Sequence, residues 1–373
     1  MDKMFNNIYQ DKNVLVTGHT GFKGSWLSLW LTELGANVIG YSLEPPSVPN
    51  LFKAIDLEKR INHIQGDIRT QTHLDDVFKK YKPEFVFHLA AQALVRRSYK
   101  EPRFTYETNI MGTISVLEAI RKTNSVKSCT IVTSDKCYEN KECDYSYKEN
   151  DPMGGYDPYS SSKGCAELIT NAYRRSFFNP KEYGEMHTVA LSSARAGNVI
   201  GGGDWGADRI MPDCIRALSK GDPIVIRNPS AIRPWQYVLE PLYGYLLLGA
   251  TMYEDGNKYS SGWNFGPNDE SIITVEELVK LVIKKWGNSS VYHVDKSVSP
   301  HEAVLLKLDK SKASSRLLWT PRYDIHETVK QTVEWYRCFY DGSNKKDLYE
   351  FTRSEIDAYI NYKKSKNKLA TSR

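Results

Sequence analysis

Short apolar runs alternate along the first half of the chain with segments whose apolar residues recur at helical spacing. The runs have the length of buried strands, and a segment such as the one with Leu74, Val77 and Phe78 presents one apolar helix face. The segments that we expect to form strands are 13–17, 37–41, 61–65, 84–88, 129–133 and 188–192. This alternation predicts an α/β fold: a doubly wound parallel sheet of the Rossmann type with helices on both faces.

Local signals place the expected helices between these strands. Apolar residues from Trp26 onward have helical spacing, and Gly35 ends that helix. Thr70 is expected to cap the next one, and a long helix is expected over about 102–122. Pro158 opens a further helix, for which Asp157 is the expected N-cap.

The rhythm changes at about Asn198, where glycines, prolines and aromatic residues become dense. We therefore predict a Rossmann domain over 1–195, with segments around 233–265 returning to it. A smaller mixed α/β domain over 196–350 is expected to bind the substrate. The remaining residues, 351–373, are expected to form a basic C-terminal tail.

The charge of the chain is uneven and argues against several classes of protein. The net charge is +5, but Lys363–Arg373 alone carries five basic residues and no acid, which leaves 45 basic and 45 acidic residues elsewhere. A nucleic-acid binder would instead show a basic face. No apolar run approaches the ~20 residues of a membrane span, and the polar N-terminus is unlike a signal peptide. Six scattered cysteines without a C-x-x-C pair suggest reduced thiols in the cytoplasm and no metal site.

A glycine motif, TGHTGFKG over 17–24, lies between the first strand and the first helix. In that context glycines let the backbone approach a pyrophosphate, and the helix N-terminus offers free N–H groups. A glycine turn without a ligand is the alternative. The ring of His19 could crowd the cofactor and weaken its binding. The residues expected near the cofactor are Gly18, His19, Gly21, Phe22, Lys23 and Gly24.

The choice of cofactor is read from the ends of the second and third strands. Residues 41–44 offer neither an acid at the tip of the strand nor an arginine for a 2′-phosphate, and we favour NAD. Asp67 and Ile68 follow the third strand, where a carboxylate could reach the adenine amino group. The alternative role for Asp67 is a helix cap.

Tyr159 and Lys163 stand four residues apart, on one face of a helix. A nearby ammonium favours the tyrosine phenolate, and a nicotinamide cation would add to the effect. A shift of about three pKa units corresponds to about 4 kcal/mol, which two cations in a dry site can supply. Such a pair also occurs by chance in many helices, but its place downstream of the glycine motif favours catalysis.

Ser134, Asp135 and Lys136 follow the fifth strand, at the edge where a doubly wound sheet binds ligands. The hydroxyl can orient a substrate hydroxyl, the acid can donate a proton if its pKa is raised, and the amine can accept one if its pKa is lowered. The alternative is a local Asp–Lys pair on the surface.

Together these motifs resemble the extended short-chain dehydrogenase/reductase family, over residues of about 12 to 340. The segment 88–92 (HLAAQ) also resembles the family's fourth strand, so Leu89, Ala90 and Ala91 are implied beside the cofactor. Within the family the third motif resembles the sugar-nucleotide 4,6-dehydratases, most of which have Thr-Asp-Glu in place of Ser134–Lys136. That departure, with HTGFKG and SDKCYEN, is similar to the branch that acts on CDP-glucose.

The resemblance implies a role for each catalytic residue. Tyr159, beside Lys163, would take the proton of the sugar 4-hydroxyl while hydride passes from C4 to NAD. Lys136 would remove the C5 proton, Asp135 would protonate the leaving 6-hydroxyl, and Ser134 would orient the 4-hydroxyl. Because a free lysine has a pKa near 10.4, Lys136 could instead act through a water or stabilise an enolate.

For the second domain the resemblance implies contacts to the sugar nucleotide. Asn198, Arg209 and Arg233 would bind the diphosphate, and guanidinium groups suit phosphate oxygens. Trp235 and Tyr237 could pack on a base or sugar, although core packing is the commoner role for such residues. The pair His301 and Glu302 resembles the position that holds the nucleotide ribose.

Two other functions share part of this pattern. A sugar-nucleotide 4-epimerase has the same fold, glycine loop and Tyr–Lys pair but needs neither Asp135 nor Lys136. A non-enzymatic NAD sensor would need only the glycine loop. Family members commonly dimerise through two long helices, here about 102–122 and 158–178, so a homodimer or a dimer of dimers is expected.

Overall fold

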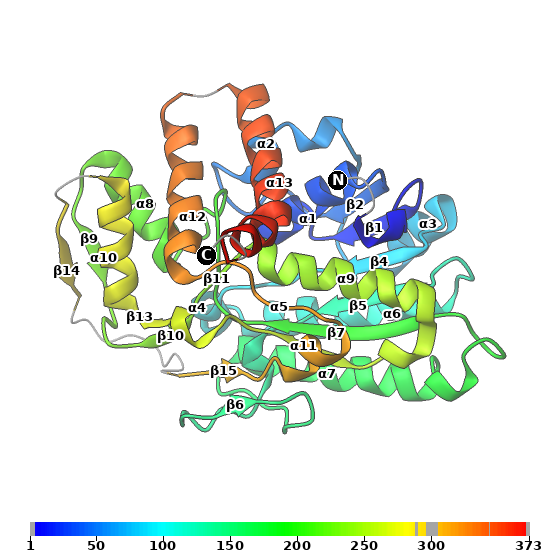
Figure 1. Ribbon diagram of the computed structural model, residues 1–373. Helices are drawn as coiled ribbons and strands as arrows, with labels where there is room; N and C mark the ends of the chain where they lie inside the picture. The colour runs from blue at the N-terminus through cyan, green and yellow to red at the C-terminus, as the bar shows by residue number, and fades with distance from the viewer. Residues whose placement is uncertain (1–3, 288–289, 296–304, 343, 371–373) are drawn as a thin grey trace.

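A seven-stranded parallel sheet forms the centre of the protein (Figure 1). The computed structural model describes residues 4–287, 290–295, 305–342 and 344–370. The strand order is β12-β7-β5-β4-β1-β2-β3, and every neighbouring pair is parallel. The strands are β1 Asn13–Thr17, β2 Asn37–Ser42, β3 Asn62–Gln65, β4 Phe85–His88, β5 Ser128–Val132, β7 Ala190–Ala196 and β12 Gly262–Phe265.

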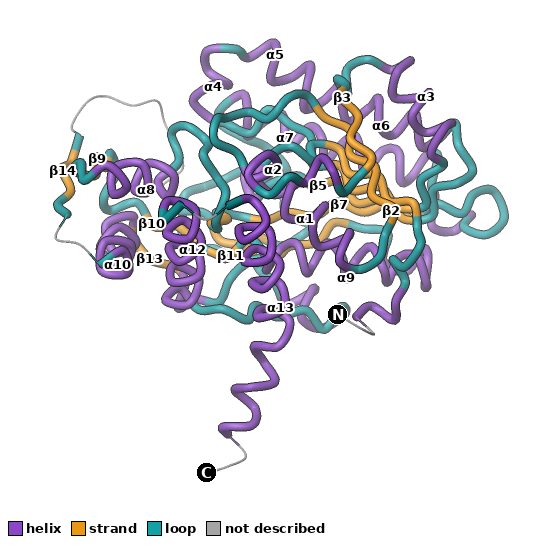
Figure 2. The backbone as a smooth tube through the Cα atoms, turned by 90° about the horizontal axis from the view of Figure 1, so that it is seen from above, coloured by secondary structure: helices purple, strands orange, loops and turns teal. Residues whose placement is uncertain are grey.

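The predicted doubly wound fold is confirmed, because helices cover both faces of this sheet (Figure 2). Alternate residues of each strand face opposite sides. Val14 and Val16 join one core with Trp26 and Leu246, whereas Leu15 joins the other. The first core packs α1 Phe22–Glu33 and α9 Leu239–Asp255, and the second packs α3 Gln71–Tyr81, α6 Gly112–Arg121 and α7 Pro158–Ser176.

The predicted strands all lie in the sheet, with small shifts at their ends. The segment 13–17 coincides with β1, whereas 188–192 is displaced, since β7 begins at Ala190 and extends to Ala196. β12 comes from the second half of the chain, within the segment expected to return to the first domain.

The predicted helix caps and helix bounds are confirmed only in part. The Asp157 carboxylate accepts a hydrogen bond from the backbone N–H of Ser160 at 3.0 Å and caps α7 as predicted. Thr70 stands at the N-cap of α3 but its side chain makes no capping bond. The helix expected over 102–122 is interrupted by a π-helical turn, Glu107–Met111, between α5 Pro102–Tyr106 and α6.

Asn109 in that π-helical turn forms hydrogen bonds with two other segments. The Asn109 side-chain amide donates to the carbonyl of Gln92 at 3.0 Å and to the Ser162 hydroxyl at 2.8 Å. The side-chain oxygen of Asn109, Oδ1, accepts a hydrogen bond from the backbone N–H of Gln92 at 2.8 Å. The turn therefore ties the loop after β4 to the first turns of α7.

Short strands and helices build the second lobe at one end of the sheet (Figure 1). The strands pair as β6 Ser146–Tyr147 with β15 Lys307–Leu308, β8 Val199–Ile200 with β11 Gln236–Tyr237, β9 Ile224–Ile226 with β14 Tyr292–Val294, and β10 Ile232–Pro234 with β13 Ile272–Thr274. The remaining helices are α2 Leu51–Ala54, α4 Val95–Lys100, α8 Ile210–Lys220, α10 Val275–Trp286, α11 Ser311–Arg316, α12 Ile325–Tyr340 and α13 Lys345–Ala370. Among the described residues, no helix combines the length and apolar character needed to cross a bilayer.

The C-terminal segment differs from the tail expected over 351–373. Residues 351–362 belong to α13, which packs against α1, α2 and α12, although its end extends away from the body in Figure 2. Ile356 and Tyr359 are fully buried. The Tyr359 hydroxyl donates to Glu240 at 2.6 Å, and the Tyr237 hydroxyl donates to Glu355 at 2.6 Å. Helical spacing of apolar residues, rather than the excess of lysines, decides the structure here.

Replacing Tyr359 tests how firmly α13 is held. Tyr359→Ala removes a buried aromatic side chain and should lower the free energy of unfolding by about 3–5 kcal/mol. Tyr359→Phe removes only the donor to the buried Glu240 and should cost about 1–3 kcal/mol. Urea denaturation followed by circular dichroism measures both, and equal stability of Tyr359→Ala and the wild type would contradict the packing of α13.

Candidate active site

The candidate active site lies where the strand order reverses, at the carboxyl ends of β1, β4 and β5. The chain leaves β1 for β2 and β3 and then crosses to β4 on the other side of β1. In open α/β sheets, ligands bind in the crevice at this reversal. The glycine loop, the segment after β4 and the turn after β5 all begin here.

Close backbone contact shapes the glycine loop. Gly18 has φ +76°, and a Cβ there would lie 2.7 Å from the backbone nitrogen of Ala90. A Cβ at Gly24 would overlap the carbonyl oxygen of Gly18. Gly21 stands at the N-cap of α1 and provides no side-chain cap. This cradle, with the uncapped helix N-terminus beside it, fits the pyrophosphate of a dinucleotide.

The side chain of His19 points from this loop toward β2. Its ring is fully buried, lies against Gly40 and packs edge-on against Phe52, with 5.2 Å between ring centroids. Its Nε2 lies 2.7 Å from Nδ1 of His63. Burial and the neighbouring His63 lower the pKa of His19 to about 3. The imidazole therefore fills space beside β2, and the expected weakening of cofactor binding by this ring stays a prediction.

Asp67 and Ile68 lie in the turn between β3 and α3. The Asp67 carboxylate accepts from the backbone N–H of Arg69 at 2.9 Å and from the Arg69 guanidinium, and these bonds lower the pKa of Asp67. Ile68 is buried, and its side chain lies against Gly112 of α6. Asp67 thus shapes the turn before α3, and its contact with an adenine stays a prediction.

Tyr159 and Lys163 occupy the first turns of α7, and both are nearly buried. The Lys163 ammonium donates to the carbonyl oxygen of Val132 at 3.4 Å, which brings α7 to the end of β5. Burial lowers the pKa of Lys163 to about 8. Burial also raises the pKa of Tyr159 to about 12, while the Ser134 hydroxyl and the positive charge of Arg209 oppose that rise.

Ser134, Asp135 and Lys136 form a single short turn beside this pair. The Ser134 hydroxyl donates to Oδ1 of Asp135 at 2.8 Å, and the Lys136 ammonium donates to the same oxygen at 3.5 Å. Asp135 is 1% exposed, so this is not a solvated surface ion pair. Its other oxygen, Oδ2, is buried without a hydrogen-bond partner among the described residues, and a substrate hydroxyl is a suitable partner for it.

Lys23 joins the site from α1. Burial, followed by the positive charges of Lys163 and Arg209, lowers the pKa of Lys23 to about 7, and Asp135 opposes this shift. The sequence placed Lys23 beside the cofactor phosphates but gave no sign that it would share the electrostatic environment of Asp135. Its position two residues after the N-cap Gly21, on a helix that starts at the sheet edge, is the signal that could have indicated this.

The residues expected to bind the sugar nucleotide are only partly brought together. Arg209, at the N-cap of α8, donates to Asp204 at 3.0 Å and influences Tyr159 electrostatically. Asn198 is partly buried just before β8, and Arg233 lies in β10.

The other expected contacts change role or lie outside the described residues. Trp235 is 5% exposed and its indole N–H donates to the carbonyl of Ile273 at 3.3 Å, which indicates core packing instead of stacking on a base. Tyr237 is likewise buried. His301 and Glu302 lie outside the described residues.

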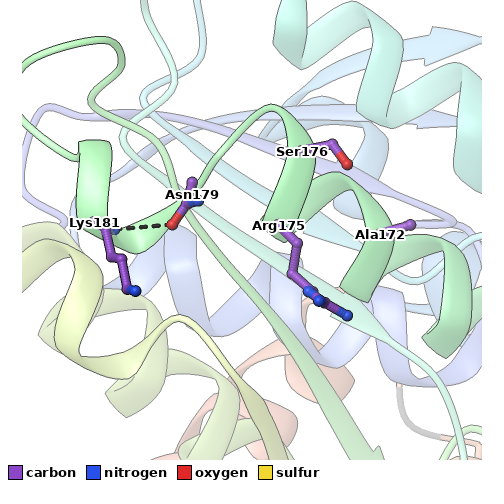
Figure 3. A pocket seen from close by; sticks show the side chains of 5 residues that line it. All are labelled: Ala172, Arg175, Ser176, Asn179 and Lys181. Atoms are coloured by element: carbon purple, nitrogen blue, oxygen red, sulfur yellow. Dashed lines mark hydrogen bonds between the residues drawn. The ribbon is translucent and has the colours of Figure 1, made fainter.

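A hollow of about 580 Å³ lies at the opposite end of α7 (Figure 3). The residues that line it are Ala172, Arg175, Ser176, Asn179 and Lys181. The side chain of Asn179 accepts from the backbone N–H of Lys181 at 3.1 Å. The hollow is more than two helical turns from Lys163 and contributes no group to the crevice.

Known proteins resemble this chain in sequence and in fold. The family model described as GDP-mannose 4,6 dehydratase matches residues 15–332. A CDP-glucose 4,6-dehydratase of Salmonella typhimurium is 51% identical over 354 residues, covering 95% of this chain and 98% of that protein. A UDP-glucose 4-epimerase of Thermotoga maritima, solved with UDP-glucose, has a TM-score of 0.75 at 24% identity, covering 88% and 99% of the two chains. A dTDP-glucose 4,6-dehydratase of Bacillus anthracis, solved with NAD, has a TM-score of 0.70 at 20% identity, covering 87% and 96%.

Gly18→Ala tests the close approach at the end of β1. A side chain at positive φ costs about 1–2 kcal/mol, and the clash with Ala90 should raise the loss of unfolding free energy to about 2–5 kcal/mol. Gly221→Ala is the matched control, because Gly221 has φ +74° but no atom within 4 Å of a built Cβ. Urea denaturation of both variants separates the steric cost from the conformational one. Equal losses would contradict the contact.

Proposed function

The chain belongs to the GDP-mannose 4,6 dehydratase family, and on that premise we propose a reaction for it. It converts CDP-D-glucose to CDP-4-keto-6-deoxy-D-glucose and water, with NAD as a regenerated cofactor. The observation that carries the proposal is the buried turn Ser134–Lys136 beside Tyr159 and Lys163. It provides an acid and an amine in addition to the tyrosine that oxidation at C4 needs. A 4-epimerase has no use for either group.

The chain's own residues provide a place for the cofactor. The loop Gly18–Gly24 would hold the pyrophosphate, Leu89–Ala91 would lie beside the nicotinamide half, and the turn at Asp67 and Ile68 would face the adenine. Bound NAD would supply a hydride acceptor for C4 and a hydride donor for C6.

Tyr159 would act as the base for the 4-hydroxyl. Because burial raises the pKa of Tyr159 to about 12, proton transfer to it requires positive charge in the site. Arg209 supplies part of that charge, and Lys163 stands one turn further along α7. Ser134, whose hydroxyl lowers the pKa of Tyr159, would hold the 4-hydroxyl in line with the phenol.

Elimination would use the other two residues of the turn. Once C4 is a ketone, the C5 proton is acidic. Transfer of one ammonium proton from Lys136 to Asp135, along the contact between them, would leave a neutral amine to accept the C5 proton directly or through one water. Asp135 would donate a proton to the 6-hydroxyl, which leaves as water. Oδ2 of Asp135 is free to contact that hydroxyl, since Oδ1 already accepts from Ser134 and Lys136. A proton returned to C5 completes the product.

The proposal extends to assembly and location. The outer faces of the helices near 102–122 and 158–178 carry exposed apolar side chains, among them Met111, Leu168 and Phe177. Two copies packed through these helices would cover them, giving a homodimer or, with a second interface, a dimer of dimers. The enzyme would work in the cytoplasm, where sugar nucleotides and NAD are available to it.

Turnover of four sugar nucleotides tests the function. The wild type, with added NAD, is expected to convert CDP-glucose in strong preference to dTDP-, UDP- and GDP-glucose, giving the alkali-induced absorbance of a 4-keto-6-deoxy sugar. Tyr159→Phe should lose about 100- to 10,000-fold in kcat, as for a missing general base. A 4-epimer without keto sugar would refute the dehydratase, and binding of NAD without turnover of any substrate would favour a sensor.

Lys136→Ala separates elimination from oxidation. It should lower kcat about 100- to 10,000-fold, and enzyme with bound CDP-glucose should accumulate reduced nicotinamide absorbance, because C4 is oxidised but C5 keeps its proton. Tyr159→Phe should show no such accumulation. Lys141→Ala, at an exposed lysine in the following loop, is the matched control and should behave as the wild type. Normal turnover by Lys136→Ala would rule out a proton transfer role for this lysine.

Leu168→Glu tests the helical interface. Leu168 is 58% exposed, so a charge there should leave the fold intact but disfavour dimerisation, because a carboxylate would be buried between copies. Size-exclusion chromatography with light scattering should show a dimer for the wild type and a monomer for the variant. Val225→Glu, an equally exposed apolar position on β9, should leave the dimer intact. A dimeric Leu168→Glu would place the interface elsewhere.

A further inference from the structure

A buried carboxylate lies one helical turn behind the Lys163 ammonium. Glu167 stands four residues after Lys163 on α7 and is 4% exposed. Its Oε1 accepts from the Thr133 hydroxyl at 2.5 Å, and its Oε2 accepts from the Ser193 hydroxyl and from Nη2 of Arg195, each at 2.7 Å. The carboxylate therefore joins α7 to the ends of β5 and β7.

Arg195 completes this buried pair from β7. Its Nη1 donates to the Tyr138 hydroxyl at 2.5 Å and to the carbonyl of Glu149 at 3.0 Å. Burial alone would raise the pKa of Glu167, but Arg195, Thr133 and Ser193 together hold it below its ordinary value, so Glu167 is an anion. Burying an ion pair is costly, and such pairs often add little net stability. A role in the geometry and charge of the neighbouring site accounts better for its presence.

Two side chains of α7 hold two consecutive residues at the end of β5. Lys163 donates to the carbonyl of Val132, and Glu167 accepts from the hydroxyl of Thr133. The backbone N–H of Thr133 also donates to the carbonyl of Ala194 at 2.9 Å. Because the next residues are Ser134–Lys136, these bonds determine where that turn lies relative to Tyr159.

Glu167 is also the principal anion near Lys163. The pKa of the Cys137 thiol is raised well above its usual range by burial, and that of His88 is lowered to about 3 by burial and by Lys163, so both side chains are neutral. The titratable groups that face Lys163 are Lys23 of α1, His88 of β4, Cys137 of the turn after β5, and Tyr159 and Glu167 of α7.

We propose that Glu167, paired with Arg195, is a positioning residue for the dehydratase reaction. It fixes the end of β5, and with it the turn Ser134–Lys136, against α7, and it supplies the negative charge that balances the Lys163 ammonium. The inference rests on the proposed function, in which Glu167 would act through Lys163 and the end of β5.

Glu167→Gln removes the charge and keeps the shape of the side chain. We expect kcat to fall about 10- to 100-fold, as for residues that orient a catalytic group, with KM for CDP-glucose within about twofold. Loss of a negative charge near Lys163 lowers its pKa, so the ammonium is lost at lower pH. The alkaline limb of the kcat profile should therefore move down by about 1–3 pH units.

Three further variants separate charge from structure. Thr133→Val removes one hydrogen bond but keeps the charge, so kcat should fall while the alkaline limb stays in place. Glu167→Asp keeps the charge and should restore that limb, which keeps the test decisive if Glu167→Gln fails to fold. Glu240→Gln is the matched control, because Glu240 is equally buried and accepts from Tyr359 and from the backbone of Arg322 and Tyr323. It should lower stability without moving the pH profile.

A readout that needs no turnover keeps this inference distinct from the proposed function. Competitive labelling of Lys163 with acetic anhydride at a series of pH values, read by mass spectrometry, reports the pKa of its amine. A lower value in Glu167→Gln than in the wild type and Glu240→Gln supports the inference, even if wild-type enzyme does not turn over CDP-glucose. An unchanged labelling profile, or an unmoved alkaline limb with a loss of stability alone, would reduce Glu167 to a structural residue.

Discussion

The ends of β1 and β4 approach so closely at Gly18 that no side chain fits between them. The contact with the backbone of Ala90 fixes the two strands at the point where the strand order reverses. The start of α1 and the loop after β4 follow from it, and both line the crevice. β5 is the next strand in the sheet, so the position of Ser134–Lys136 also depends on this register. A contact between backbone atoms therefore determines how the glycine loop, the loop after β4 and the turn Ser134–Lys136 lie relative to one another.

The site contains more positively charged than negatively charged side chains, and each of its two anions lies near one lysine. Asp135 lies near Lys23, and Glu167 lies near Lys163. Burial lowers the pKa of both lysines, to about 8 for Lys163 and, with the added effect of Lys163 and Arg209, to about 7 for Lys23. Burial also raises the pKa of Tyr159 to about 12, so its phenol is protonated at neutral pH. A cationic crevice of this kind suits a ligand with a diphosphate, because the ligand brings the negative charge that the protein leaves out.

The sequence predicted the first half of the molecule well because each strand there is bounded by a polar residue or a glycine. It placed the turn Ser134–Lys136 after β5, and the structure adds that Asp135 is buried. It did not predict that α13 packs into the core, since the lysine-rich end of that helix concealed the spacing of Ile356 and Tyr359. Side-chain direction was the other missing information: His19 faces β2, and Trp235 faces the core. Both follow from packing between segments far apart in the chain, which local patterns do not contain.

The π-helical turn at 107–111 has a consequence for any attempt to make this protein more stable. A regular α-helix would have better hydrogen-bond geometry, so a designer who wants a more stable helix would delete one residue of this turn. Such a deletion would rotate the chain on one side of the turn by about 100°. Asn109 could then no longer reach both Gln92 and Ser162. The loop after β4 and the start of α7 would lose their common anchor, so the irregular turn is a case where local stability has been given up for the alignment of two distant segments.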